Sequence, residues 1–136
     1  MQSALTQSET FPLIDTLIRL FEAGDPAIMT MISNNIDFRI DHYNDDADVS
    51  WQQASNLQEF GGVLTRLATD IFPKGTKIIA LESESLDDGW VTTRFRQQFF
   101  YGLMQQMVES ATVILSHETD GKIDFFRETV LTVEKI

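Results

Sequence analysis

The chain has 136 residues, of which 43% are hydrophobic and 10% aromatic, as is typical of a single globular domain spanning 1–136. Its 21 acidic residues outnumber 10 basic ones, and the net charge of -11 disfavours nucleic acid and anionic membrane surfaces as partners. No cysteine is present, so disulfides and thiolate chemistry are excluded. The first residues do not form a signal peptide, and no apolar run reaches the ~20 residues of a membrane helix, so a cytoplasmic protein is expected.

Three helices are predicted ahead of the main run of strands, after a polar and frayed segment at 1–9. The first helix has Pro12 in its first turn, carries apolar residues at helical spacing and ends at Gly24. Asp25-Pro26 begins a second, short helix, because Asp accepts hydrogen bonds from the first turn and Pro suits the first position. Asn56 is predicted to cap the third helix, which carries a buried stripe.

The strands are predicted from alternation and from turn residues. A turn at 33–35 precedes the first of them, and Asp87-Asp88-Gly89 and Asp120-Gly121 are typical hairpin turns. The expected strands are 36–43, a short return strand at 49–51, and then 77–86, 90–101, 107–117 and 122–133. A strand of ~11 residues spans about 35 Å and cannot stay flat. We therefore predict an α+β fold, in which three helices pack on the concave side of a curved, mostly antiparallel sheet.

The order of these elements is accompanied by four short segments that recur together in known proteins. They are Asp25-Pro26, the strand from Asn35 to Ile40, Trp51 with the helix start at 57–60, and the closing segment 120–128. With them the chain resembles the nuclear transport factor 2-like superfamily, which includes ketosteroid isomerases and the SnoaL-like polyketide cyclases. The resemblance covers residues ~10 to 133.

This resemblance implies a cystatin-like, cone-shaped α+β barrel with a hydrophobic pocket, usually dimeric through the outer face of its sheet. It does not imply one activity, because such folds include isomerases, cyclases, hydrolases and plain binding modules. The ketosteroid isomerase-like members carry a carboxylate base near the end of the first strand. Here Ile40 stands near that position, and Asp41 beside it lies on the opposite face of the strand.

Polar residues on otherwise apolar faces are the candidate catalytic groups. His42 shares its strand face with apolar residues and titrates near neutrality, and Asp41 adjoins it. Glu109 lies on an apolar face of the strand 107–117, and Arg127 on an apolar face of the last strand. A buried arginine needs an acidic partner or an acidic ligand. The two are therefore predicted either to pair structurally or to orient a polar group of a ligand.

The ligand itself is expected to be small and hydrophobic. The residues predicted to contact it share the faces assigned to the concave side of the sheet: Phe38, Gln97, Phe99, Tyr101, Phe125 and Arg127. No metal-binding spacing or phosphate-binding loop occurs, so no cofactor is expected.

The opposite face of the strand 90–101 carries Trp90, Arg94 and Arg96. Tryptophan and arginine are favoured in protein interfaces, so this face is predicted to bind a second copy of the chain or another protein. The alternative is a solvated face whose arginines pair with Glu82 and Glu84 of the neighbouring strand. Two functions follow: a SnoaL-like pocket protein, either an isomerase or cyclase or a ligand binder, and a non-catalytic dimeric interaction module.

Overall fold

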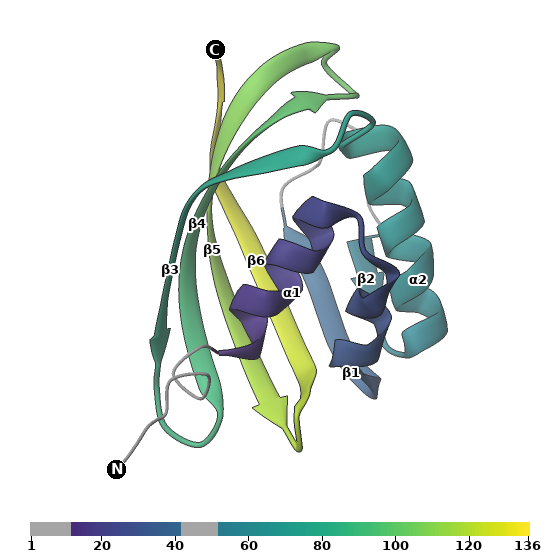
Figure 1. Ribbon diagram of the computed structural model, residues 1–136, viewed down its shortest axis with the longest axis vertical. Helices are drawn as coiled ribbons and strands as arrows, with labels where there is room; N and C mark the ends of the chain where they lie inside the picture. The colour runs from purple at the N-terminus through teal and green to yellow at the C-terminus, as the bar shows by residue number, and fades with distance from the viewer. Residues whose placement is uncertain (1–11, 42–51) are drawn as a thin grey trace.

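The computed structural model describes residues 12–41 and 52–136 and places helices on one side of a six-stranded sheet (Figure 1). The elements are α1 (Leu13–Ala23), the 3-10 helix η2 (Pro26–Met31), β1 (Ile32–Asp41), β2 (Gln53–Ala54), α2 (Leu57–Arg66), its π-helical continuation η4 (Leu67–Ile71), β3 (Thr76–Ser85), β4 (Trp90–Tyr101), β5 (Gln106–Thr119) and β6 (Lys122–Lys135). The predicted α+β architecture is confirmed. No helix in the described part of the chain is long and apolar enough to cross a membrane.

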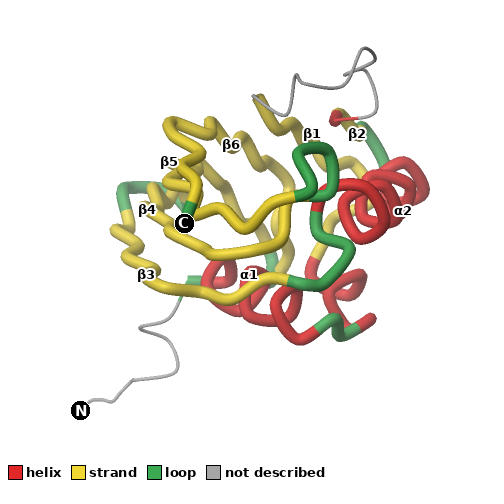
Figure 2. Tube along the Cα trace, turned by 90° about the horizontal axis from the view of Figure 1, so that it is seen from above, coloured by secondary structure: helices red, strands yellow, loops and turns green. Residues whose placement is uncertain are grey.

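The sheet has the strand order β2-β1-β6-β5-β4-β3. Every pair of neighbouring strands is antiparallel except β1 and β6, which run parallel. Strands β4, β5 and β6 have 12, 14 and 14 residues, and a sheet of such long strands twists and curls. Figure 2 shows the sheet bent around the helices, which lie on its concave side.

Local sequence signals set the ends of most elements. Gly24 ends α1 with a φ of 67°, in the left-handed region that glycine adopts most readily. The Asp25 side chain accepts a hydrogen bond from the Ala27 N–H, and the Asn56 side chain accepts one from the Glu59 N–H. These residues therefore start η2 and α2 as their positions predicted.

One part of the predicted secondary structure is corrected. The segment Ser33–Asn35 is not a turn but belongs to β1, whose register against β6 shifts between Ile32 and Asp37. In this irregular stretch Asn34 and Asn35 are exposed and Ser33 is half-buried, so their polar side chains keep access to water. The return strand predicted at 49–51 lies outside the described residues. Among the described residues, β2 pairs with Phe38 and Arg39 through residues 53–54.

The core lies between the helices and the concave face of the sheet. Buried residues of α1 and α2, such as Ile14 and Phe60, meet buried residues of β1 and β6. The Phe38 ring stacks on Phe126 at a centroid distance of 4.6 Å and meets Phe60 edge-on at 5.1 Å. Because α1 also contacts β3 while α2 contacts β1 and β2, the helices bridge the two sides of the curved sheet. The hollow that remains between them is the candidate site.

Candidate functional site

A small cavity of about 60 Å³ lies between the helices and the concave face of the sheet. Its wall is mostly apolar, with aliphatic side chains from α1, η2, α2 and β1. Phenylalanines from helices and strands complete the wall: Phe21, Phe38, Phe60, Phe72, Phe95 and Phe126. The polar residues among the described ones that line it are Gln97 of β4 and Glu128 of β6. An apolar hollow with few polar groups is the usual form of a small-molecule site.

Glu128 is the most unusual group of this cavity. It lies opposite Ile114 of β5 and beside Ile40 of β1, and 7% of it is exposed. Burial raises its pKa from the ordinary 4.5 to about 7, because the surroundings cannot solvate the charged form. The Thr112 hydroxyl lies beside the carboxyl and lowers this pKa, although it lacks the geometry of a full hydrogen bond. No basic side chain of the described residues pairs with Glu128.

Further polar side chains continue from Glu128 across the inner face of the sheet. We call Gln97, Ser110, Thr112 and Glu128 the polar strip, which runs over β4, β5 and β6. Gln97 lies opposite Ser110, and its amide oxygen accepts a hydrogen bond of 2.6 Å from the Thr76 hydroxyl. The buried hydroxyls of Ser110 and Thr112 have no hydrogen-bond partner among the described residues. The polar strip thus contains two buried hydroxyls without hydrogen-bond partners, next to an apolar cavity.

Four of the predicted ligand-contacting residues lie on the concave side. Phe38 and Gln97 line the cavity directly. Phe99 and Tyr101 are buried on the same face of β4, with ring centroids 5.7 Å apart, and Phe99 contacts Phe72 at 4.4 Å. These two belong to the core beside the cavity rather than to its lining.

The predicted positions of Glu109 and Arg127 are wrong, because both side chains are on the outer face of the sheet. Glu109 accepts hydrogen bonds from Arg96 at 3.1 Å and from Gln98 at 2.9 Å. These contacts lower its pKa, with the Gln98 hydrogen bond as the largest cause. In the register of β5 and β6, Glu109 lies opposite Glu134 and Arg127 opposite Leu115, so the predicted pair does not form.

Phe125 is on the outer face together with Arg127. The Arg127 guanidinium lies 4.9 Å from the centroid of the Phe125 ring and 3.5 Å from a carboxylate oxygen of Asp37. The sequence prediction counted alternate residues from Ile123, which is buried, and so placed Phe125 and Arg127 on the inner face. The pairing of β5 with β6 shifts between His117 and Glu118, and Phe126 rather than Phe125 is the next fully buried residue. A bulge of one residue reverses the faces that follow it.

The predicted catalytic residue of β1 does not line the cavity. Asp41, the last residue of β1, is bound to the Arg39 side chain at 2.6 Å, and both side chains are well exposed. His42 lies outside the described residues. Among the described residues, the carboxyl that lines the cavity is therefore Glu128, whereas the sequence pattern predicted Asp41 or Glu109 for that place.

The predicted interface residues lie on the outer face, and all three make contacts within the chain. Arg94 pairs with Glu82 at 3.0 Å, which agrees with the alternative of a solvated face, whereas Arg96 pairs with Glu109. Trp90 lies against the His117 ring, with centroids 4.7 Å apart, and meets the Phe125 ring edge-on at 5.2 Å.

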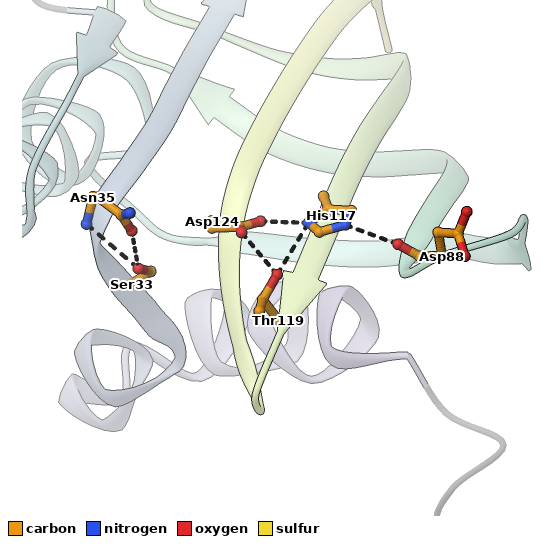
Figure 3. Close-up of polar contacts among 6 residues, drawn as sticks. All are labelled: Ser33, Asn35, Asp88, His117, Thr119 and Asp124. Atoms are coloured by element: carbon orange, nitrogen blue, oxygen red, sulfur yellow. Dashed lines mark hydrogen bonds and ion pairs between the residues drawn. The ribbon is translucent and has the colours of Figure 1, made fainter.

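His117 connects the ends of three strands (Figure 3). Its Nδ1 lies 2.7 Å from an Asp124 carboxylate oxygen, and its Nε2 lies 2.8 Å from the Asp88 carbonyl oxygen. The Thr119 hydroxyl donates to the other Asp124 oxygen at 2.9 Å. The Asp124 hydrogen bond, followed by the Asp88 carbonyl, raises the pKa of His117. Burial acts to raise the pKa of Asp124, but the hydrogen bonds from His117 and Thr119 outweigh it and lower the pKa.

The fold and its apolar hollow define a class, the cone-shaped α+β proteins that enclose a pocket. Solved structures that share this fold include NTF2-like proteins. This chain is similar to an NTF2-like protein from Anabaena variabilis, at 14% identity and a TM-score of 0.74 over 97% of this chain and 98% of that one. It is also similar to a candidate polyketide cyclase from Xanthomonas campestris, at 13% identity and a TM-score of 0.68 over 86% of each chain.

A candidate isomerase from Rhodopseudomonas palustris is similar at 15% identity and a TM-score of 0.67, over 94% of this chain and 93% of that one. No family model and no curated protein sequence matches the chain. The structural likeness establishes that the chain has the NTF2-like fold. It is carried by backbone geometry rather than by shared residues, so the chemistry must be argued from this chain's own side chains.

Proposed function

We propose that this protein is a small-molecule pocket protein that performs acid–base chemistry, an isomerisation or a cyclisation, on a hydrophobic carbonyl compound. The observation that carries the proposal is Glu128, a buried carboxyl with a pKa of about 7 in the wall of an apolar cavity. A group with a pKa near the working pH both removes and returns protons efficiently. The candidate cyclases and isomerase that share this fold agree with such a reaction class.

In the proposed reaction the Glu128 carboxylate removes a proton from a carbon next to the ligand's carbonyl group. The electron pair of that C–H bond forms an enolate, with negative charge on the carbonyl oxygen. The side-chain amide of Gln97, which also lines the cavity, donates a hydrogen bond to this oxygen. Where a C=C bond of the ligand is conjugated with the enolate, return of the proton from Glu128 to the far carbon of that bond restores the carboxylate and yields an isomer with the double bond moved. Attack of the enolate carbon on a second carbonyl of the same ligand closes a ring, and the proton then passes to the new alkoxide.

Hydrogen–deuterium exchange in D2O tests this step with a ketone that fits the cavity. A volume of about 60 Å³ holds about four water-sized groups, so butan-2-one is a suitable probe. The wild-type protein should speed exchange of the protons next to the carbonyl, and Glu128→Gln should abolish the effect. Glu109→Gln is the matched control, because this glutamate lies on the outer face. Equal exchange by wild type and Glu128→Gln would refute the assignment.

The outer face supports a second proposal, that the chain forms a homodimer or binds another protein through the sheet. On this face Val113 of β5 is 37% exposed opposite Arg94, and Met107 is 43% exposed opposite Phe100. Apolar and arginine side chains together are favoured in interfaces. Light scattering should give twice the chain mass for wild type and one chain mass for Val113→Glu, whereas Leu86→Glu in the β3–β4 turn should stay dimeric. A monomeric wild type would contradict the dimer.

A further inference from the structure

A second hollow, much larger than the cavity, lies directly outside it. This groove has a volume of about 740 Å³ and runs between the end of α1, η2, α2 and the start of β3. Four residues line both hollows: Phe21, Ile28, Leu64 and Phe72. They form a partition one side chain thick. Phe21 and Leu64 are half-buried, whereas Ile28 and Phe72 are buried, so the first two have the greater freedom to move aside.

The sizes of the two hollows show that the cavity alone is not a complete site. Small-molecule sites have volumes of about 300 to 1,000 Å³, and the cavity with its single carboxyl has about 60 Å³. The cavity therefore accepts only the end of a ligand. The groove is large enough for the remainder, and it meets the cavity across the partition of four side chains.

Charge restricts what can occupy this combined space. The charged side chains that line the groove are Glu22 and Asp25, and the one that lines the cavity is Glu128. Neither lining contains a lysine, arginine or histidine among the described residues. Glu22 accepts a hydrogen bond from the Ile78 N–H and Asp25 accepts one from the Ala27 N–H, so the backbone fixes both carboxylates in place. An anionic group would lose its water here and meet only like charge.

We propose that the cavity and the groove form one binding site for an elongated ligand that carries no negative charge. Its small carbonyl-bearing end occupies the cavity at Glu128, and its longer part lies in the groove between α1 and α2. Carboxylates, phosphates and ligands tethered to a phosphate-bearing carrier are excluded by the acidic lining. This inference rests on the proposed function and deepens it by naming the charge and shape of the substrate.

Two probes of equal length test the inference by isothermal titration calorimetry at neutral pH. They are 9-oxodecanamide, which is neutral, and 9-oxodecanoate, which carries a carboxylate at the groove end. The amide should bind at least about tenfold more tightly, a modest difference for a charge that faces carboxylates near a protein surface. Equal affinities, tighter binding of the carboxylate, or no binding of the amide would each overturn the inference.

A pair of lysine variants on α2 tests where the discrimination arises. Thr65 lines the groove and is exposed, so Thr65→Lys brings a cation to the groove and should reduce the preference for the amide severalfold or more. Gly62→Lys adds the same charge to the same helix at a residue that does not line the groove, where an added Cβ meets nothing within 4 Å, and should leave the preference unchanged. If both variants change the ratio equally, net charge rather than the groove is responsible, and the inference fails.

The two proposals fail in different ways. If Glu128→Gln exchanges ketone protons as fast as wild type while the amide is still preferred, the acid–base function is wrong and the composite site stands. If butan-2-one exchange depends on Glu128 but the amide and the carboxylate bind equally, the function stands and the composite site is wrong.

Discussion

Replacement of Glu128 by glutamine is expected to change how the stability of the protein depends on pH. The glutamine side chain resembles the protonated carboxyl in shape and neutrality, so the substitution removes the charge and little else. In the wild type, the pKa of this carboxyl is about 7 in the folded state and near 4.5 in the unfolded chain. That difference corresponds to about 3 kcal/mol of unfolding free energy.

The sign follows from which state holds the proton. Between about pH 4.5 and about pH 7 the folded protein keeps a proton that the unfolded chain has released, so wild-type stability falls as the pH rises. The contribution is fully present below the unfolded value and is lost above the folded value. Glu128→Gln should therefore match the wild type near pH 4.5 and exceed its stability by up to about 3 kcal/mol near pH 8.

Urea denaturation followed by circular dichroism, at several pH values from about 4.5 to about 8, measures this difference directly. His117 has a raised pKa, and its own contribution also falls as the pH rises through that value, so only the wild-type minus variant difference is informative. The same pH series on Glu109→Gln controls for the loss of a surface charge. A stability difference that stays constant across this range would refute the assignment of a perturbed carboxyl at Glu128.

Three further predictions follow from particular contacts. Asp124→Asn should return the raised pKa of His117 toward its ordinary 6.5 in an NMR titration, and an unchanged pKa would show that the Asp88 carbonyl alone holds the proton. Gly102→Ala should destabilise the protein by about 1 to 3 kcal/mol, because its Cβ would lie 2.1 Å from a backbone oxygen of η4. Gly62→Ala, whose Cβ meets nothing within 4 Å, should instead stabilise it by about 0.5 to 1 kcal/mol. Thr112→Val should leave chemical denaturation unchanged or shift it to higher urea, because the buried hydroxyl it removes has no hydrogen-bond partner, and a marked loss would disprove this.

The proposed acid–base role and the pH dependence rest on the same side chain, which the sequence pattern does not single out. Glu128 lies among alternating residues of β6, with Phe126 and Val130 on its face. That face carries fewer apolar residues than the opposite face of the last strand, which has Ile123, Phe125, Leu131 and Val133. Counting alternate residues over the predicted strand 122–133 therefore selects the wrong face, because the opposite face has more hydrophobic residues and one charged residue, Arg127, whereas the face of Glu128 has three charged residues.

The choice between two strand faces also explains why the sequence pattern predicted Glu109 on the inner face of β5. One face of β5 carries Met107, Ala111, Val113 and Leu115, and the other carries Val108 and Ile114 among serines and threonines. Counting apolar residues selects the first face, yet the second is buried. Residues directly opposite one another in an antiparallel pair share a face. Because Gln97 of β4 points inward, its partner Ser110 must point inward as well.

Local interactions were sufficient to determine the elements. Gly24, Asp25 and Asn56 act on the backbone within a few residues of themselves, and Asp-Gly pairs with positive φ form the turns at 88–89 and 120–121. The inner face of β4 was also determined, since its alternation from Val91 to Tyr101 continues without a bulge in its pairing with β5. The caps and turns depend on residues close together in the sequence, which is why the sequence predicts them.

The tertiary structure decided which face of β5 and β6 became the interior, and so which carboxyl became the candidate acid. The register of β5 on β4 and the shifts in the pairing of β5 with β6 are properties of strand pairs, not of single strands. A shift of one residue exchanges inside and outside for all that follows. The perturbed pKa of Glu128 has the same origin, because burial depends on the helices and strands that close around the side chain, far from it in the sequence.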